Sequence, residues 1–292
     1  MAIVSVTPRL EGRITLRDGR SLAYAEWGDP RGRPVVKFHG MPATRLQCPD
    51  ADATMAAGVR LITIDRPGYG WSDPKPGRSL LGWADDYAEL HTQLDLPPCP
   101  VMGWSGGGPY ALACAFRLPA IVTSVGVAGS VGPITEVPGS FSEEARRLSR
   151  LLPDDPQGVL DEVVKEWQGF ADDPTSLFDG WFEASDQPPS PDARLFARPD
   201  VREAMTEWAR DAARQGSAGV VADAMAFMQP WGFPLAEIRC DAAVWVGDGA
   251  PADRDESDFL AAAIPGSTYV ILPGEGHLAP ITRWAEMLAW LH

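Results

Sequence analysis

The chain has 292 residues, a formal net charge of -15 and 45% hydrophobic residues. This length and hydrophobic content are typical of one globular α/β domain that carries an inserted subdomain, and they exclude a largely disordered chain. The negative charge argues against nucleic acid or an anionic membrane as a partner, because both bind a basic protein face. We therefore expect a small-molecule substrate as the partner.

The N-terminal segment and the cysteines and histidines bear on location and on metal binding. Residues 1–16 contain no basic stretch followed by an apolar run, and no run of about 18 apolar residues occurs in the chain. A cytoplasmic location is therefore expected. The four cysteines show no CxxC spacing and the four histidines show no HExxH pattern. We predict free thiols, no metal and no other cofactor.

Alternating polarity in residues 14–28, with Asp18-Gly19 in the middle, predicts a hairpin of two half-buried strands joined by a tight turn. After this segment the sequence pattern changes to short apolar runs that end in or near a glycine. Such runs are typical of strands in a parallel sheet that is covered by helices on both faces. They lie at residues 34–40, 59–68, 99–106, 121–129, 242–249 and 267–277.

Stretches compatible with helix separate these runs, at residues 80–95, 108–117, 254–263 and 282–291. Their alternation with strands predicts an α/β fold with a doubly wound, mostly parallel sheet that is preceded by the antiparallel hairpin.

One block, residues 131–233, interrupts this alternation. It has no convincing strand, but it has amphipathic stretches at 142–152, 158–170 and 200–228. We predict that residues 1–130 and 234–292 form the core domain. Residues 131–233 would then form a helical cap over the carboxyl edge of the sheet, where ligands bind in such folds.

The sharpest chemical signal is Gly103-Trp104-Ser105-Gly106-Gly107, which lies directly after an apolar strand and directly before a helix. A serine at the apex of a strand-turn-helix needs small residues two positions before and after it, and the glycines meet this need. The amide of Gly106, at the start of the helix, is placed to stabilise an oxyanion. A phosphate-binding loop is the alternative, but the spacing fits neither GxGxxG nor GxxxxGK[ST]. We therefore predict Ser105 as a nucleophile.

A second oxyanion donor is expected from the loop His39-Gly40-Met41-Pro42. Gly40 permits a tight turn there, and the amide of Met41 is the candidate donor because Pro42 has no N–H. His39 precedes the serine on a neighbouring strand end, so we predict a role in stabilising the turn rather than in base catalysis.

Four segments together carry a family resemblance: HGMP at 39–42, DRPGYGWS at 65–72, GWSGGGPYALACA at 103–115 and GEGH at 274–277. They resemble the α/β-hydrolase superfamily, in particular a bacterial branch with a GWSGGGPYALA elbow. The resemblance covers residues 34–117 and 242–291. It implies Ser105 as nucleophile, His277 as base, and Gly106 and Met41 as oxyanion donors.

Chain order also supports His277 as the base, apart from the resemblance, because this histidine follows the last apolar strand and comes after the serine. The acid of the triad departs from the family pattern, since the usual position, three residues after Gly247, is Ala250. Asp248 and Asp253 are the nearby alternatives. Asp253 with Glu256 fits a helix N-cap and its capping box, so Asp248 is our prediction for the catalytic acid.

A serine nucleophile implies an acyl-enzyme route on an ester, lactone or thioester. Trp104 and Gly40 are expected to contact a largely apolar substrate, and cap tryptophans either line the pocket or pack in the core. These are Trp167, Trp181, Trp208 and Trp231. The missing acid at the usual position leaves a non-hydrolytic catalyst or a binding protein acting on a biosynthetic intermediate as the alternative.

Asp65 and Arg66 lie in the segment DRPGYG and have the residue types of a catalytic pair. We predict instead a buried ion pair that stiffens this loop. The following Pro67 and Gly68 mark a turn at the mouth of the site.

Overall fold

The computed structural model describes residue 4 and residues 6–137, 141–178 and 189–292. Its centre is an eight-stranded sheet with the strand order β1-β2-β4-β3-β5-β6-β7-β8. The strands are β1 (Leu10–Thr15), β2 (Ser21–Gly28), β3 (Arg33–Phe38), β4 (Val59–Ile64), β5 (Cys99–Trp104), β6 (Val122–Ala128), β7 (Asp241–Gly247) and β8 (Thr268–Leu272).

The predicted N-terminal hairpin is confirmed. Strands β1 and β2 pair antiparallel, with Ile14 opposite Leu22, and Gly19 in the turn has a φ of +89°. Strand β2 also pairs antiparallel with β4, while all pairs from β4 to β8 are parallel. The sheet is therefore mostly parallel with an antiparallel edge, as the sequence predicts.

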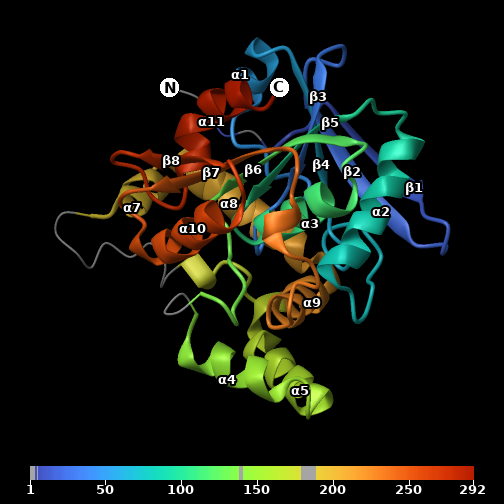
Figure 1. Cartoon of the computed structure of the whole chain (residues 1–292), viewed down its shortest axis with the longest axis vertical. Helices are drawn as coiled ribbons and strands as arrows, with labels where there is room; N and C mark the ends of the chain where they lie inside the picture. The colour runs from blue at the N-terminus through green and yellow to red at the C-terminus, as the bar shows by residue number, and fades with distance from the viewer. Residues whose placement is uncertain (1–3, 5, 138–140, 179–188) are drawn as a thin grey trace.

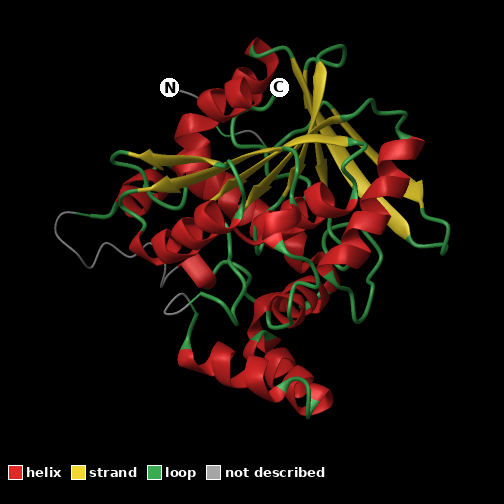
Figure 2. Ribbon diagram, viewed as in Figure 1, coloured by secondary structure: helices red, strands yellow, loops and turns green. Residues whose placement is uncertain are grey.

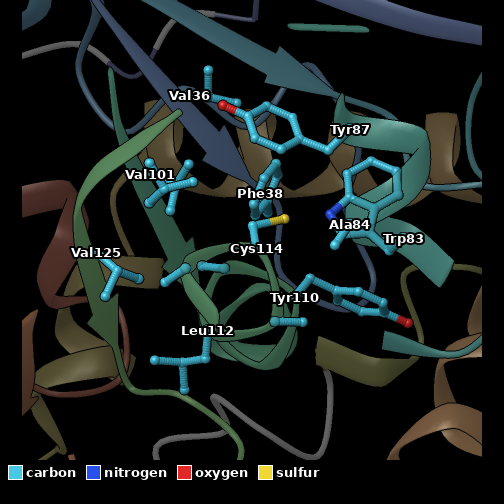
Figure 3. Packing of buried hydrophobic residues seen from close by; sticks show 14 of the residues in the cluster. Val36, Phe38, Trp83, Ala84, Tyr87, Val101, Tyr110, Leu112, Cys114 and Val125 are labelled. Atoms are coloured by element: carbon cyan, nitrogen blue, oxygen red, sulfur yellow. The ribbon is translucent and has the colours of Figure 1, made fainter. Parts of the chain in front are cut away.

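Helices cover both faces of this sheet (Figure 2). One face is covered by α2 (Leu80–Gln93), α3 (Gly108–Arg117) and α10 (Pro251–Ala263), and the other by α1 (Ala51–Ala56) and α11 (Ala279–Trp290). Apolar side chains of α2 and α3 meet those of β3 and β5 in the larger core (Figure 3). Phe38 and Trp83, for example, pack edge to face at 5.3 Å between ring centroids. This core holds the carboxyl ends of the central strands in place.

The chain between β6 and β7, which we call the helical segment, contains no strand among its described residues. Its predicted run at 200–228 divides into two helices, because Gly216 between them has a φ of +74°. In Figure 1, α4 and α5 project away from the sheet. Helix α8 packs through Trp208 on Trp104, the last residue of β5. The α-helices whose bounds are described there are α4 (Glu143–Leu151), α5 (Pro156–Glu166), α7 (Pro191–Phe196), α8 (Pro199–Ala212) and α9 (Ala218–Phe227).

Within the described residues, the helices are too short or too polar to cross a lipid bilayer.

Candidate active site

Ser105 occupies a sharp turn between the central strand β5 and helix α3. Its φ is +54°, in the left-handed region that residues with a side chain rarely adopt. A Cβ on Gly103 would lie 2.5 Å from the carbonyl oxygen of Gly107, and a Cβ on Gly107 would lie 2.3 Å from that of Phe38. Both contacts are with backbone, which cannot move aside. The turn therefore requires glycine at these two positions, as expected for an exposed nucleophile.

The loop after β3 lies directly against this turn. A Cβ on Gly40 would be 3.4 Å from the Cβ of Ser105, and a Cβ on Gly106 would be 3.1 Å from that of Met41. The amide of Gly40 donates to Oε1 of Gln47 at 2.9 Å, so it is already used. The arrangement leaves the predicted amides of Met41 and Gly106 as the candidates beside the serine.

Gln47 was not predicted, yet it connects this loop to a buried lysine. Its Oε1 accepts a hydrogen bond from Nζ of Lys37 at 2.7 Å as well as from Gly40. Lys37 is fully buried, and burial lowers the pKa of its ammonium group to about 7. Lys37 and Gln47 thus hold the loop in place through hydrogen bonds. The available sequence signal was Lys37, a charged residue between the apolar Val36 and Phe38.

His39 has the structural role that the sequence predicts. Its Nε2 accepts the backbone N–H of Arg66 at 3.1 Å, and its Nδ1 lies 2.7 Å from the carbonyl oxygen of Gly40. The ring is therefore neutral with its proton on Nδ1. Burial, together with the nearby guanidinium of Arg66, holds the pKa of His39 well below its usual value.

His277 follows β8, and its Nδ1 lies 2.7 Å from Oδ2 of Asp253. Asp248, the carboxylate that we predicted for this contact, instead accepts the backbone N–H of Gly274 at 2.7 Å. The structure therefore corrects the assignment of the partner. Burial alone would lower the pKa of His277, but the charge of Asp253 and its hydrogen bond raise it to about 9.

The expectation that Asp253 caps a helix is also wrong. Helix α10 begins at Pro251 with Ala250 as its N-cap residue, and Asp253 lies within the first turn without capping it. The usual family spacing from Gly247 places the acid on the loop after β7. Here the loop is short, and the first helical turn carries the carboxylate to the histidine.

A glycine also makes room for the Asp253 and His277 side chains. Gly129, just after β6, has a φ of +49°, and a Cβ there would lie 3.0 Å from Oδ2 of Asp253 and 3.1 Å from Nδ1 of His277. A larger residue would crowd both groups of the pair. Asp253 and His277 therefore lie at the carboxyl ends of β6 and β7.

Ser105 and His277 line the same small cavity, of about 40 Å³. Among the described residues no hydrogen bond joins their side chains; the ring of His277 binds Asp253 instead. Trp104 also lines the cavity, and its Nε1 donates to the carbonyl oxygen of His277 at 3.1 Å. The other lining residues are Gly40, Met41, Pro42, Gln47, Phe178, Met205, Trp208 and Leu278.

The predicted pocket tryptophans have different places. Trp208 lines the cavity and packs edge to face on Trp104, with 6.1 Å between ring centroids. Trp167 and Trp231 pack in hydrophobic clusters instead, and Trp181 lies outside the described residues. Of the three that the structure describes, Trp208 is the one that lines the cavity with the serine.

Asp65 and Arg66 are both buried and ion-paired, but not with each other. Asp65 binds Arg45, whose Nη1 lies 3.0 Å away, and Arg66 binds Asp223 of α9 at 2.6 Å. The predicted pair is therefore wrong in its partners, because strand-end neighbours point in opposite directions and each reaches a different element. Adjacency in sequence could not reveal this.

Asp223 is the centre of a buried polar cluster that sequence reasoning missed. Besides Arg66, it accepts hydrogen bonds from Tyr69 at 2.7 Å, from Tyr110 at 2.6 Å and from Arg78. Burial alone would raise the pKa of Asp223, but the two arginines hold it below its usual value.

This cluster connects the helical segment to the loop beside the serine. Arg66, which binds Asp223 of α9, also donates to the carbonyl oxygens of His39 and Gly40. Helix α9 is therefore joined to the backbone on which the oxyanion candidates lie. A single aspartate in an otherwise apolar helix was the sequence signal.

The sequence profile of the alpha/beta hydrolase family matches residues 35–290 of the chain. Among solved structures, an esterase from Exiguobacterium antarcticum has a TM-score of 0.67 with this chain at 21% identity. The superposition covers 96% of this chain and 98% of that one. At this identity the likeness concerns the fold.

Two curated relatives match the chain over a shorter region. A non-heme chloroperoxidase from Streptomyces lividans is 36% identical over 129 residues, which are 42% of this chain and 46% of that protein. A bifunctional esterase/perhydrolase from Acinetobacter calcoaceticus is 36% identical over 114 residues, which are 37% of this chain and 40% of that protein. The matched region spans less than half the length of each relative.

Proposed function

Because the chain belongs to the alpha/beta hydrolase family, we propose that it is a serine hydrolase that cleaves esters, lactones or thioesters of small apolar molecules. The observation that carries this proposal is the 2.7 Å contact between His277 and Asp253, on the cavity that Ser105 also lines. A nucleophile, a base and an orienting carboxylate are the groups that acyl transfer requires.

In the proposed reaction, neutral His277 accepts the proton of the Ser105 hydroxyl while its oxygen attacks the carbonyl carbon. The amides of Met41 and Gly106 stabilise the oxyanion that forms. The protonated imidazole then gives its proton to the leaving alcohol or thiol, and an acyl-enzyme remains. Water, deprotonated by the same imidazole, releases the acid and restores the serine. Asp253 holds the proton-bearing Nδ1 throughout.

The size and lining of the cavity favour a short acyl group. Its volume of about 40 Å³ holds only a few water-sized groups, and apart from Ser105, His277 and Gln47 its lining side chains are mostly apolar. Met41, Met205 and Trp208 offer no charge to a polar substrate. We therefore propose acetyl and similarly short acyl groups as the best substrates, with the rate falling as the acyl chain lengthens.

A non-hydrolytic role was the alternative as long as the triad lacked an acid at the usual position, Ala250. The contact between Asp253 and His277 removes that reason, because a carboxylate from the next helical turn reaches the imidazole. Hydrolysis is therefore the function that we propose.

The test compares p-nitrophenyl acetate, butyrate and octanoate, together with labelling by a fluorophosphonate probe. We expect turnover of the acetate, and we expect both turnover and labelling to be lost in Ser105→Ala and turnover to be lost in His277→Ala. Ser124→Ala is the matched control, because that hydroxyl is buried in β6 without a hydrogen-bond partner among the described residues. Undiminished labelling of Ser105→Ala would show that another residue reacts.

A further inference from the structure

Asp192 in the first turn of helix α7 reaches across to the loop that carries the proposed base. Its Oδ2 accepts the backbone N–H of His277 at 2.9 Å, and its Oδ1 accepts that of Leu278 at 2.8 Å. These N–H groups precede helix α11, which begins at Ala279 and has no side-chain cap of its own. A carboxylate from the helical segment thus satisfies two backbone donors immediately before this helix.

Two glycines of the core leave room for this approach. A Cβ on Gly276 would lie 2.3 Å from a carboxylate oxygen of Asp192, and a Cβ on Gly249 would lie 2.6 Å from the ring of Pro191. One glycine belongs to the loop after β8 and the other to the loop after β7. Both loops therefore lack the side chains that would hold α7 away.

The opposite side of the His277 backbone is held by a second residue. Trp104, next to the serine, donates its indole N–H to the carbonyl oxygen of His277 at 3.1 Å. The N–H of His277 is bound to Asp192 and its carbonyl to Trp104, so the position of the imidazole depends on both. Trp104 belongs to the sheet, whereas Asp192 belongs to the helical segment.

We propose that Asp192 is a positioning residue for His277, through which the helical segment holds the catalytic base in register with Ser105. The inference rests on the proposed function, because the place of a base matters only where that base acts. Asp192 touches neither the imidazole ring nor, in this mechanism, the substrate.

The charge of Asp192 provides a second readout besides the rate, because it acts on the titration of His277. Burial lowers the pKa of His277, while the charge and hydrogen bond of Asp253 raise it. Asp192 of α7 and Glu256 of α10 add smaller contributions in the same raising direction. Removal of the Asp192 charge is therefore expected to lower the pKa of the base.

The experiment measures kcat/KM for p-nitrophenyl acetate and the NMR titration of the His277 imidazole, assigned with His277→Ala. In Asp192→Asn one acceptor is lost and an amide N–H₂ faces a backbone N–H. We expect kcat/KM to fall about tenfold through kcat with little change in KM, as for the loss of one hydrogen bond to a charged acceptor. The titration of His277 should move to lower pH.

Asp161→Asn is the matched control, because it removes the same charge from an exposed position on α5 and should leave both readouts unchanged. Asp192→Ser, which keeps one acceptor without the charge, answers the same question if the asparagine variant fails to fold. An unchanged titration and a kcat/KM within twofold of the parent would overturn the inference. Lack of ester turnover by the unaltered chain would instead contradict the proposed function.

Discussion

The strand-end residues of the sheet and the helical segment reach the site by different physical means. At the strand ends, backbone geometry places the side chains: Ser105 has a φ of +54°, and Gly103 and Gly107 fit only because they lack a Cβ. The helical segment reaches the same loops through carboxylates. Asp192 binds the loop of His277, and Asp223 binds the arginine that holds the carbonyls of the oxyanion loop.

This difference shows which parts of the molecule depend on local rules and which on distant partners. The glycine spacing of the serine turn is a local pattern that can be read in the sequence, although Gly107 also lies against the carbonyl oxygen of Phe38. The carboxylates work only through residues far along the chain, such as Arg66 for Asp223. A substitution in the Asp223 cluster should therefore change mainly the free energy of unfolding, whereas one that alters the contacts of His277 should change catalysis.

The largest effect is expected from the acid of the triad. Asp253→Asn should lower kcat/KM by about 10⁴-fold, because the imidazole loses the carboxylate that fixes its tautomer and stabilises its charge. Asp248→Asn should stay within about threefold, since its carboxylate binds Gly274 instead. Steady-state kinetics with p-nitrophenyl acetate measures both. Equal losses in the two variants would refute the assignment of Asp253.

The next effect concerns the attachment of the helical segment. Asp223→Asn should reduce the free energy of unfolding by about 3–5 kcal/mol, because Arg66 and Arg78 lose their buried counter-charge. Urea denaturation followed by fluorescence measures the change. Asp161→Asn on the exposed face of α5 should lie within about 0.5 kcal/mol of the parent. A loss below about 1 kcal/mol in Asp223→Asn would show that the cluster does not stabilise the fold.

A smaller effect is expected at the glycines of the serine turn. Gly103→Ala should cost about 1–3 kcal/mol of unfolding free energy, because the new Cβ would lie 2.5 Å from a backbone oxygen. Gly169→Ala in the helical segment meets open space and should be neutral or slightly stabilising. Thermal unfolding of the two variants side by side tests the contrast. Equal melting temperatures would mean that the turn adapts without strain.

The smallest effect is the pH dependence of the base. Proton transfer from Ser105 requires neutral His277, so kcat/KM should rise with pH toward a plateau above about 9. One pH unit below that pKa it should be about tenfold lower. The contribution of the His277–Asp253 pair to the free energy of unfolding has the opposite pH dependence. It is complete below the unfolded pKa of about 6.5 and is lost as pH rises through about 9. A kcat/KM profile that is flat from pH 7 to 9 would contradict the raised pKa.

The sequence by itself determined the mostly parallel sheet, the N-terminal hairpin and the strand-to-helix turn at Ser105. Periodicity, glycine spacing and strand-to-helix order are local properties, so these elements could be predicted. The position of His277 after the last strand followed from chain order in the same way.

The tertiary structure alone decided which carboxylate meets which partner. Asp253 reaches His277 because α10 begins at Pro251, and Asp223 reaches Arg66 because α9 folds back over the sheet. A buried charge pairs with whatever opposite charge the fold brings within about 3 Å, and no local pattern specifies that neighbour. The partners of Asp248, Asp65 and Arg66 were therefore predicted wrongly from sequence.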